Sequence, residues 1–498
     1  MEKNDRGVRS ILVLGGGAAG WLAAALLTRA LRPERYRVIV LDDSRQTPRP
    51  ASEATGPVFR HTLALLGVDE AQLMRATDAT FSLGIEFRDW SATGEHYLHG
   101  YGAVGARLEA VPFHHYWLRL RELGDPHGFE EYSIACCAAR SGRFAHPSSD
   151  RTSPLSLYSY GYHFNAQQLT AYLRAYAEQR GAVCTSGRAI ELQRSASGLV
   201  QSVVLEDHAR LEADLVLDCN AASDSPVTGA LSGAWQDWEG WWPGNRAVLI
   251  DGAKPVELKP CSQFQALSQG WAWHTPLRRG SEHGFAYRSD MLSDDQALAS
   301  ARALAGAQAE FGQPRVLRFQ VGRPLKFRQG NYIALPGASL PPLHHLRLQL
   351  VQTGVSRLLL LFPQDTSDPD DAAEYNRLTA FEYDRIRDFL AAHFLLSART
   401  DSPLWRDRAQ IGISDELEQR LALFRDSGRL GSFEDEPFDQ DDWMSLLVGR
   451  GIMPPQHDPL ADVMNIEDVR SALATARHSI ARAAASLPLH ERYLADRQ

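Results

Sequence analysis

The chain has few lysines and cysteines and no long hydrophobic run. Of its 52 basic residues only Lys3, Lys254, Lys259 and Lys326 are lysines. The five cysteines are odd in number and lack the spacing of a disulfide framework or a zinc site, which predicts reduced thiols and no metal. No apolar stretch approaches the roughly 18 residues of a membrane span. The polar N-terminus leads directly into a strand-like segment, so we expect no signal peptide.

Charge and length narrow the class of protein. The 498 residues carry a formal net charge of −9, which argues against general binding of nucleic acid or anionic membranes. Apolar residues make up 44% of the chain, enough for a large core in two domains or one elaborated domain. The sequence therefore predicts a cytoplasmic globular protein.

A glycine-rich turn near the N-terminus indicates a dinucleotide site. Gly15, Gly17 and Gly20 form a G-x-G-x-x-G motif between an apolar strand over 10–14 and a helix over 21–30. A second strand over 37–41 ends at Asp42, about 20 residues on, where a carboxylate can accept from ribose hydroxyls. The pyrophosphate would lie at the helix N-terminus. The alternative is a turn that only closes a βαβ unit, and the motif does not separate FAD from NAD.

The rest of the chain mixes strands and helices. We expect helices over 56–75, 163–180 (with Asn165 as N-cap), 295–311, 369–397 and 461–486. Strands are expected over 80–90, 211–218 and, as a pair, 189–206. Linkers are expected near 140–155 and 429–442.

Several segments together resemble the flavin-dependent tryptophan halogenases. The motifs that carry the resemblance are Gly15-Gly-Gly-Ala-Ala-Gly-Trp21 (family GGGxAGW), Ser52-Glu-Ala-Thr55 (GEAT), Phe81-Ser-Leu-Gly-Ile-Glu-Phe-Arg-Asp-Trp90 (FKLGIKFxNW), His115-Tyr-Trp-Leu-Arg119, Tyr162-His-Phe-Asn165, Trp271-Ala-Trp273-His-Thr-Pro276 (WxWxIP), 352–363 and 402–406. Together they cover nearly the whole chain.

The resemblance implies an α/β (α+β) fold in which a Rossmann-like FAD box, similar to hydroxybenzoate hydroxylase, joins a mostly helical substrate-binding pyramid. By this likeness the FAD box takes 8–110, 155–225 and 315–365, and the pyramid takes 111–154, 226–314 and 366–498. The implied FAD contacts are Gly15, Gly17, Ala18, Gly20, Trp21, Asp42, Glu53, Ala54, Thr55, Ile190, Leu335 and Leu348.

In the family a separate reductase supplies FADH2, which reacts with O2 and halide to give hypohalous acid. The acid then reaches a catalytic lysine, which halogenates an electron-rich ring with help from a glutamate. There is no second G-x-G-x-x-G at a strand–helix junction, so a dedicated NAD(P)H domain is not evident.

The residues that halogenate in the family are missing here. Ser82 stands at the lysine position, and a hydroxyl neither holds halogen as a chloramine nor acts as a cation. Aligning Pro341–Gly354 with the family segment EPLESTSIHLIQTG puts His344 at the glutamate. The small hydroxyl residues that help hold chloride become His345, Leu346 and Arg347. The family's DCSG reads 218–221 Asp-Cys-Asn-Ala.

Each candidate site residue has a functional interpretation and a structural one. His344 is a candidate general acid or base, or it fills the space of the glutamate. His99, His345 and Trp443 are candidate substrate contacts, with structural packing as the alternative. Trp271, Trp273 and Pro276 belong to the signature that lies near the flavin and blocks direct monooxygenation in relatives, or they are simply core. Adjacent histidines without a further ligand pair do not predict a metal site.

From these departures we expect an FADH2- and O2-dependent oxidoreductase that oxygenates or oxidises a small aromatic or peptide-borne indole without halide. The alternatives are a true halogenase with a displaced catalytic residue, and a flavin- or ligand-binding protein without turnover. A flavin reductase is the expected transient partner, and a homodimer stays open.

Overall fold

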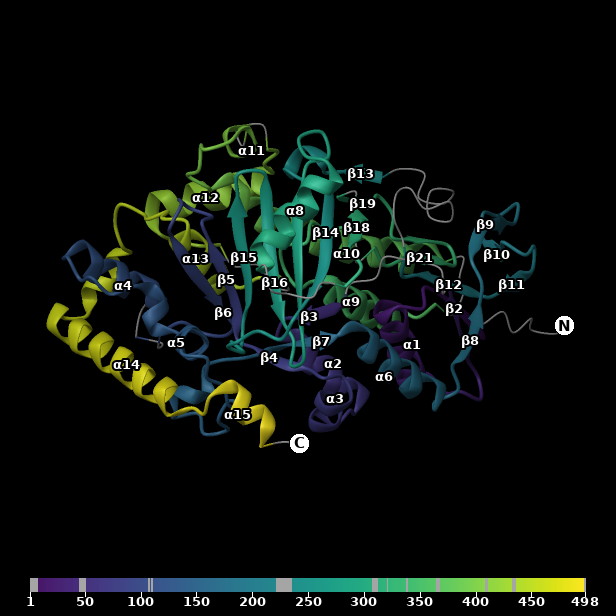
Figure 1. Ribbon diagram of the computed structural model, residues 1–498, viewed down its shortest axis with the longest axis horizontal. Coiled ribbons are helices and arrows are strands. Elements are labelled where there is room, and N and C mark those ends of the chain that lie inside the picture. The colour runs from purple at the N-terminus through teal and green to yellow at the C-terminus, as the bar shows by residue number, and fades with distance from the viewer. Residues whose placement is uncertain are drawn as a thin grey trace.

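The computed structural model describes residues 8–43, 51–105, 108, 111–220, 235–306, 312–319, 321–336, 339–363, 368–407, 411–431 and 436–496. In Figure 1 a parallel sheet lies toward the N-terminus, a long antiparallel sheet stands at the centre, and helices from the C-terminal half lie beyond it. This mixed architecture confirms the predicted α/β class. The predicted division into two discontinuous domains stays a prediction.

The sheet of the dinucleotide motif has the order β20-β21-β12-β1-β2-β8. Every pair of neighbouring strands in this sheet is parallel except the pair of β21 with the short β20. Its central strands are continuously apolar because helices or loops cover both faces of the sheet. Its strands are β1 (Ser10–Leu14), β2 (Arg37–Asp42), β8 (Val183–Ser186), β12 (Leu215–Asp218), β20 (Arg328–Gln329) and β21 (Tyr332–Ala334). The predicted βαβ unit is confirmed, since β1 pairs in parallel with β2.

Helix α1 (Ala18–Ala30) is buried along almost its whole length. Its alanines allow close approach of α6 (Ala166–Glu178) and α9 (Arg347–Leu360), which pack on it. The single helix predicted over 56–75 is wrong: α2 (Val58–Leu66) ends at Gly67, whose φ of 65° is left-handed, and α3 (Glu70–Ala76) starts anew from an Asp69 cap.

The central sheet has seven strands in the order β18-β14-β17-β16-β15-β5-β6. Its strands are β5 (Gly84–Arg88), β6 (His96–Gly100), β14 (Arg246–Gly252), β15 (Ser262–Leu267), β16 (Gly270–Pro276), β17 (Ser281–Tyr287) and β18 (Arg315–Arg318). Only β5 and β15 pair in parallel, and they join the N-terminal third of the chain to the β14–β17 hairpins. Helix α8 (Asp294–Ala305), shorter than the predicted 295–311, contacts β14 and β17.

Three small sheets complete the strands. They contain β3 (Ser52–Thr55), β7 (Gly161–Asn165) and β4 (Thr80–Ser82); β9 (Ala189–Arg194), β10 (Val200–Leu205) and β11 (Arg210–Glu212); and β13 (Trp235–Asp237) with β19 (Gly322–Pro324). The strand predicted over 80–90 is interrupted at Leu83, whose N–H donates to Pro260 O, so that β4 and β5 enter different sheets. The strand predicted over 211–218 is likewise two strands, β11 and β12. His163 lies in β7 and not in the predicted helix, while Asn165 caps α6 as predicted, accepting from Gln168 N at 3.0 Å.

The remaining helices form the helical part of the molecule. They are α4 (Phe113–Glu122), α5 (Ile134–Arg140), α10 (Pro369–Leu395), α11 (Pro403–Arg406), α12 (Asp415–Ser427), α13 (Gln440–Gly449), α14 (Ile466–Ser486) and α15 (His490–Ala495), with 3-10 turns η1 (Phe129–Tyr132), η2 (Pro154–Ser156), η3 (Glu239–Trp241) and η5 (Pro459–Val463). The predicted helix over 369–397 is confirmed, and the one over 461–486 begins only at Ile466. The linker predicted over 429–442 runs into α13, because Asp439 caps that helix by accepting from Asp442 N. Among the described residues no helix is long and apolar enough to cross a membrane.

Candidate functional site

A cavity of about 290 Å³ lies where β3, the central sheet and the segment before α9 meet. Apolar side chains dominate its wall, with a few charged and imidazole groups among them, as expected for a small-molecule site. It is lined by Ser52, Glu53, Ala54, Leu249, Phe264, Trp273, Thr275, Glu282, Leu317, Arg318, Phe319, Leu340, Pro341, Pro342, His344, His345, Leu346 and Arg347.

The glycine motif forms an open cradle at the start of α1. Gly17 is the N-cap and supplies no side-chain cap, and the first turn holds no acidic residue, so the helix end is suited to an anion. A Cβ at Gly17 would meet nothing within 4 Å. By contrast, a Cβ at Gly20 would lie 1.7 Å from Gly15 O, and one at Gly16 would lie 1.9 Å from Asp42 Oδ1. The motif therefore packs helix against strand and leaves space for a pyrophosphate, which fits the dinucleotide half of FAD.

Strand β3 brings Glu53, Ala54 and Ser52 to the cavity wall. Glu53 is buried and forms an ion pair with Arg347 of α9. Ser52 Oγ donates to Glu282 Oε1 at 2.9 Å, and burial raises the pKa of the Glu282 carboxyl despite this bond. Thr55 turns from the cavity and its Oγ1 accepts from Tyr162 N at 3.2 Å.

The other predicted FAD contacts are spread over separate elements. Ile190 lies on β9 and is 37% exposed, whereas Leu335 follows β21 and is buried. Trp21 is buried in α1 beneath the guanidinium of Arg174, and Leu348 is buried in α9. Their contact with FAD stays a prediction.

His344 lies at the aromatic end of the cavity. Its ring centroid is 5.5 Å from those of Phe389 and Phe438 and 5.6 Å from that of Phe87. Its Nε2 lies 3.1 Å from Nε2 of His393. Burial, and then the nearby His99, holds the pKa of His344 well below its usual value, so the ring is neutral near pH 7.

His345 points into a different hydrogen-bond chain. Its Nε2 lies 2.8 Å from Ser262 Oγ, which lies 2.9 Å from His163 Nε2. Burial lowers the pKa of His345 to about 4. Although His344 and His345 are adjacent in sequence and both line the cavity, they belong to separate hydrogen-bond chains.

Ser82 is fully buried on β4, and its Oγ donates to Gly84 O at 3.2 Å. It is not among the residues that line the cavity, so the structure does not join Ser82 and His344 in one site. The lining also contains no lysine. Lys254 pairs with Glu491, and Lys259 Nζ lies 3.8 Å from Glu257 Oε2, both away from the cavity.

The two signature tryptophans have different surroundings. Trp273 lines the cavity. Its ring packs so closely on Gly284 that a Cβ at that glycine would lie 2.0 Å from Trp273 Cζ2. Trp271 is fully buried, and its indole N–H donates to Pro342 O at 3.0 Å, which holds the segment before His344 against β16. Pro276 O accepts from Thr80 Oγ1 at 3.2 Å.

The predicted substrate contact His99 lies on β6, and the predicted contact Trp443 lies on α13, the helix that packs on this strand. His99 Nε2 is 2.7 Å from Asp442 Oδ1, and its buried Nδ1 has no hydrogen-bond partner in the described part of the chain. Trp443 is buried, 5.0 Å edge-on from Phe389, with Arg420 stacked over its indole at 4.6 Å. Both are packed against other residues, and contact with substrate stays a prediction.

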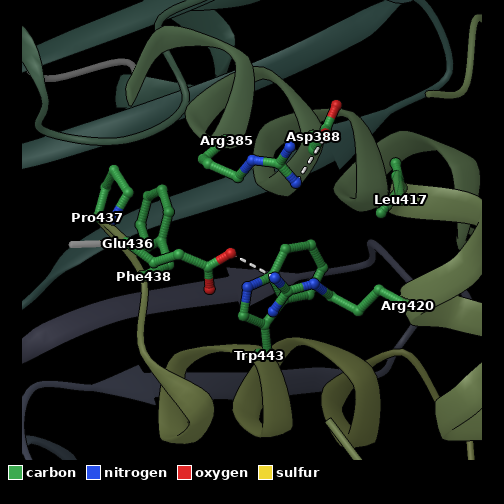
Figure 2. A pocket seen from close by; sticks show the side chains of 8 residues that line it. All are labelled: Arg385, Asp388, Leu417, Arg420, Glu436, Pro437, Phe438 and Trp443. Atoms are coloured by element: carbon green, nitrogen blue, oxygen red, sulfur yellow. Dashed lines mark hydrogen bonds and ion pairs between the residues drawn. The ribbon is translucent and has the colours of Figure 1, made fainter. Parts of the chain in front are cut away.

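Behind Trp443 lies a second cavity of about 10 Å³, room for about one water. Figure 2 shows Arg420 between Trp443 and the Glu436 carboxylate, with Arg385 directed toward Asp388. Burial raises the pKa of the Asp388 carboxyl. The charged groups here pair with each other, so this region serves to support Trp443.

Sequence reasoning missed His393, Arg450 and Phe438, which surround His344. Each is a single polar or aromatic residue in or beside a helix, and no local pattern marks it. Among the residues that the structure describes, no group of three metal-binding side chains occurs.

The comparisons with known proteins agree on one family. The family model for tryptophan halogenase matches residues 10–466. The chain is 27% identical to the tryptophan 7-halogenase RebH of Lentzea aerocolonigenes over 91% of each chain. Among solved structures, it is similar to BrvH, a flavin-dependent halogenase from Brevundimonas sp. BAL3, with 33% identity and a TM-score of 0.92 over 99% of this chain and 100% of that one. A flavin-dependent halogenase from Xanthomonas campestris gives the same identity and TM-score over 98% of both chains.

Proposed function

Because the chain belongs to the tryptophan halogenase family, a family of flavin-dependent enzymes, we propose that it is a flavin-dependent halogenase acting on an electron-rich aromatic such as an indole. The comparisons favour this alternative over our expectation of a halide-independent oxygenase, which is unconfirmed. The relatives are named as halogenases across the full length of this chain.

The observation that carries the proposal is the cavity between β3 and the segment before α9. It lies beside Glu53 and Ala54, in the motif that the family uses for FAD, and it contains Trp273 of the signature. The Gly15–Gly20 cradle would hold the pyrophosphate, and Asp42 the ribose. Bound reduced FAD would supply, with O2 and halide, the hypohalous acid that halogenates the ring.

The chain's own residues then confine and direct this oxidant. Phe264, Trp273 and Leu340 give part of the wall an apolar surface, against which an aromatic ring would pack. The wall contains no ammonium group, so the halogen would reach the substrate without a lysine. The neutral imidazoles of His344 and His345 are among the groups of the lining able to exchange hydrogen bonds with it.

A separate flavin reductase would deliver FADH2. The family resemblance supports this division of labour, and the sequence has no second dinucleotide motif at a strand–helix junction. An indole, free or carried on a peptide, is the substrate class that the relatives' names support.

Halide-independent oxygenation of the same substrate class is the second candidate. It is favoured by one observation: the family's lysine and glutamate positions hold Ser82 and His344, which are separated in the structure and carry no charge near pH 7.

The test mixes anaerobic protein and reduced FAD with oxygenated buffer, with and without chloride or bromide, and follows flavin absorbance in a stopped-flow spectrometer. Products from a panel of indoles are identified by mass spectrometry. A halogenated product and halide-dependent flavin kinetics are expected. Products that carry oxygen and form equally without halide would replace the proposal by the second candidate. Flavin oxidation identical to that of free FADH2, without product, would reject both.

A further inference from the structure

Among the residues that the structure describes, the buried cation Arg450 has no carboxylate partner. It is 3% exposed, and the rings of Trp90, Tyr97 and Phe87 surround its guanidinium at 5.0, 5.3 and 5.9 Å. Its Nε and Nη1 have no hydrogen-bond partner among the described residues. Its Nη2 lies 3.0 Å from His393 Nδ1. An arginine buried without a counter-ion lowers stability.

The contact determines where the protons of two imidazoles lie. Arginine can only donate, so His393 Nδ1 must accept. Burial, and then Arg450, holds the pKa of His393 well below its usual value, so His393 is neutral and carries its proton on Nε2.

That proton faces His344. Because His393 Nε2 donates across the 3.1 Å contact, His344 Nε2 must accept. A neutral His344 then carries its own proton on Nδ1. Among the described residues Nδ1 of His344 has no partner, and His344 lines the cavity.

The neighbouring His345 has the opposite arrangement. Burial of His163 leaves it neutral. Thr80 Oγ1 donates its proton to Pro276 O and lies 3.2 Å from His163 Nδ1, so Nδ1 donates to Thr80 and Nε2 of His163 accepts from Ser262 Oγ. Ser262 Oγ then accepts from His345 Nε2 at 2.8 Å. His345 therefore carries its proton on Nε2, and its Nδ1 is an acceptor.

We propose that Arg450 is a positioning residue that acts through His393 to hold His344 in its Nδ1–H form, and that this N–H is a hydrogen-bond donor at the His344 end of the cavity for a hydroxyl-bearing oxidant. The part of the proposal that concerns the oxidant rests on the proposed function, in which the oxidant is hypohalous acid. The tautomer itself does not depend on that function.

The Nδ1–H of His344 would take over part of the role that the family's lysine ammonium has toward hypohalous acid. As the halogen moves to the ring, a carbon–halogen bond forms and the oxygen–halogen bond breaks, with its electron pair going to oxygen. The oxygen takes the proton lost by the ring carbon and leaves as water. His344 keeps its proton throughout and stabilises the charge that grows on oxygen, an effect worth about 10²-fold in rate for one well-placed donor.

The experiment is ¹⁵N NMR of the full chain with labelled histidine, because protonated and unprotonated ring nitrogens are well separated in such spectra. His344→Gln and His345→Gln assign the two signals by their loss. We expect His344 protonated on Nδ1 and His345 on Nε2. The same tautomer in both residues, or His344 protonated on Nε2, would overturn the proposal.

Variants test the relay, by which we mean the chain of contacts from Arg450 through His393 to His344. Tyr97 Oη lies 3.4 Å from the same His393 nitrogen and could donate in place of Arg450. Arg450→Met combined with Tyr97→Phe, and His393→Leu alone, therefore remove the relay, and each should leave His344 in a mixture of tautomers. His393→Gln is the matched control: its amide oxygen can accept from Arg450 and its N–H can donate to His344, so the wild-type tautomer should be kept. Unchanged spectra in Arg450→Met combined with Tyr97→Phe would also reject the role of Arg450.

Rates separate this proposal from the proposed function. If halogenated product forms, Arg450→Met combined with Tyr97→Phe, and His344→Phe alone, should lower kcat by about 10²-fold with little change in KM, and His393→Gln should retain activity. Absence of halogenation with the predicted tautomers present would reject the halogenase function and the oxidant, and leave the relay standing.

Discussion

The carboxylate of Glu53 on β3 is paired with the guanidinium of Arg347 in the first turn of α9. This pair closes one side of the cavity and connects the strand of the GEAT-like motif to the helix that follows His344 and His345. Arg347 thus places a positive charge beside the cavity, and Glu53 of β3 neutralises it.

Breaking this pair should affect both stability and cofactor binding. Glu53→Gln leaves Arg347 without its counter-ion beside a buried strand, and we expect the free energy of unfolding to fall by about 2 kcal/mol. FAD affinity, measured by quenching of flavin fluorescence, should fall with it. Glu374→Gln, which removes the exposed partner of Arg377, is the control and should change neither. Equal behaviour of the two variants would contradict the role of the pair.

The glycines of the cradle should separate folding from cofactor binding. Gly17→Ala meets no atom within 4 Å and has φ −87°, so the protein should fold normally but lose FAD affinity at least tenfold because the methyl group occupies the anion cradle. Gly20→Ala brings Cβ to 1.7 Å from Gly15 O and should destabilise the fold. Thermal unfolding and FAD titration measure the two effects. Normal FAD affinity in Gly17→Ala would show that the pyrophosphate does not lie there.

Restoring lysine at position 82 should not restore the family's site. Ser82 is fully buried and its hydroxyl is bonded to Gly84 O, so an ammonium there would be desolvated without a paired carboxylate. We expect Ser82→Lys to lose several kcal/mol of stability, and Ser82→Ala about 1 kcal/mol. Urea unfolding gives both values. A stable Ser82→Lys protein that halogenates faster than wild type would show that this position still faces the oxidant.

Acid should destabilise the protein through its buried histidines. His490 Nδ1 donates to Leu258 O and its Nε2 accepts from Phe81 N, and burial lowers its pKa to about 4. The unfolded chain, with a histidine pKa near 6.5, binds protons first. The contribution of His490 is therefore complete above about pH 6.5 and is lost as pH falls toward 4, a change of about 3 kcal/mol.

The pH prediction is checked by urea unfolding of wild type and His490→Gln between pH 8 and 5. The two curves of stability against pH should converge on acidification, because the variant lacks this titration. Parallel curves would mean that His490 is already protonated in the folded state or titrates normally.

Much of the fold and part of the site could be read from local sequence. The βαβ unit around Gly15–Gly20, the cap at Asn165 and the helix over 369–395 depend on residues close to one another in the chain. The same holds for the family motifs. Boundaries failed where a tertiary contact intervened: Leu83 bonds to Pro260 and splits one strand into two, and Asp439 begins a helix inside a predicted linker.

The sequence by itself determined the family, and it predicted the FAD cradle and the replacement of the family's lysine and glutamate by Ser82 and His344, because these depend on which residue types occupy given positions. Only the tertiary structure decided what the replacements can do. It buried Ser82 away from the cavity, tied His344 and His345 to separate hydrogen-bond chains, and brought His393 and Arg450 behind His344. The His344–His393, Arg450–His393 and His345–Ser262 contacts join residues that are 49, 57 and 83 positions apart in the chain. The positions of the protons follow from this packing, because it makes one group a donor and its neighbour an acceptor.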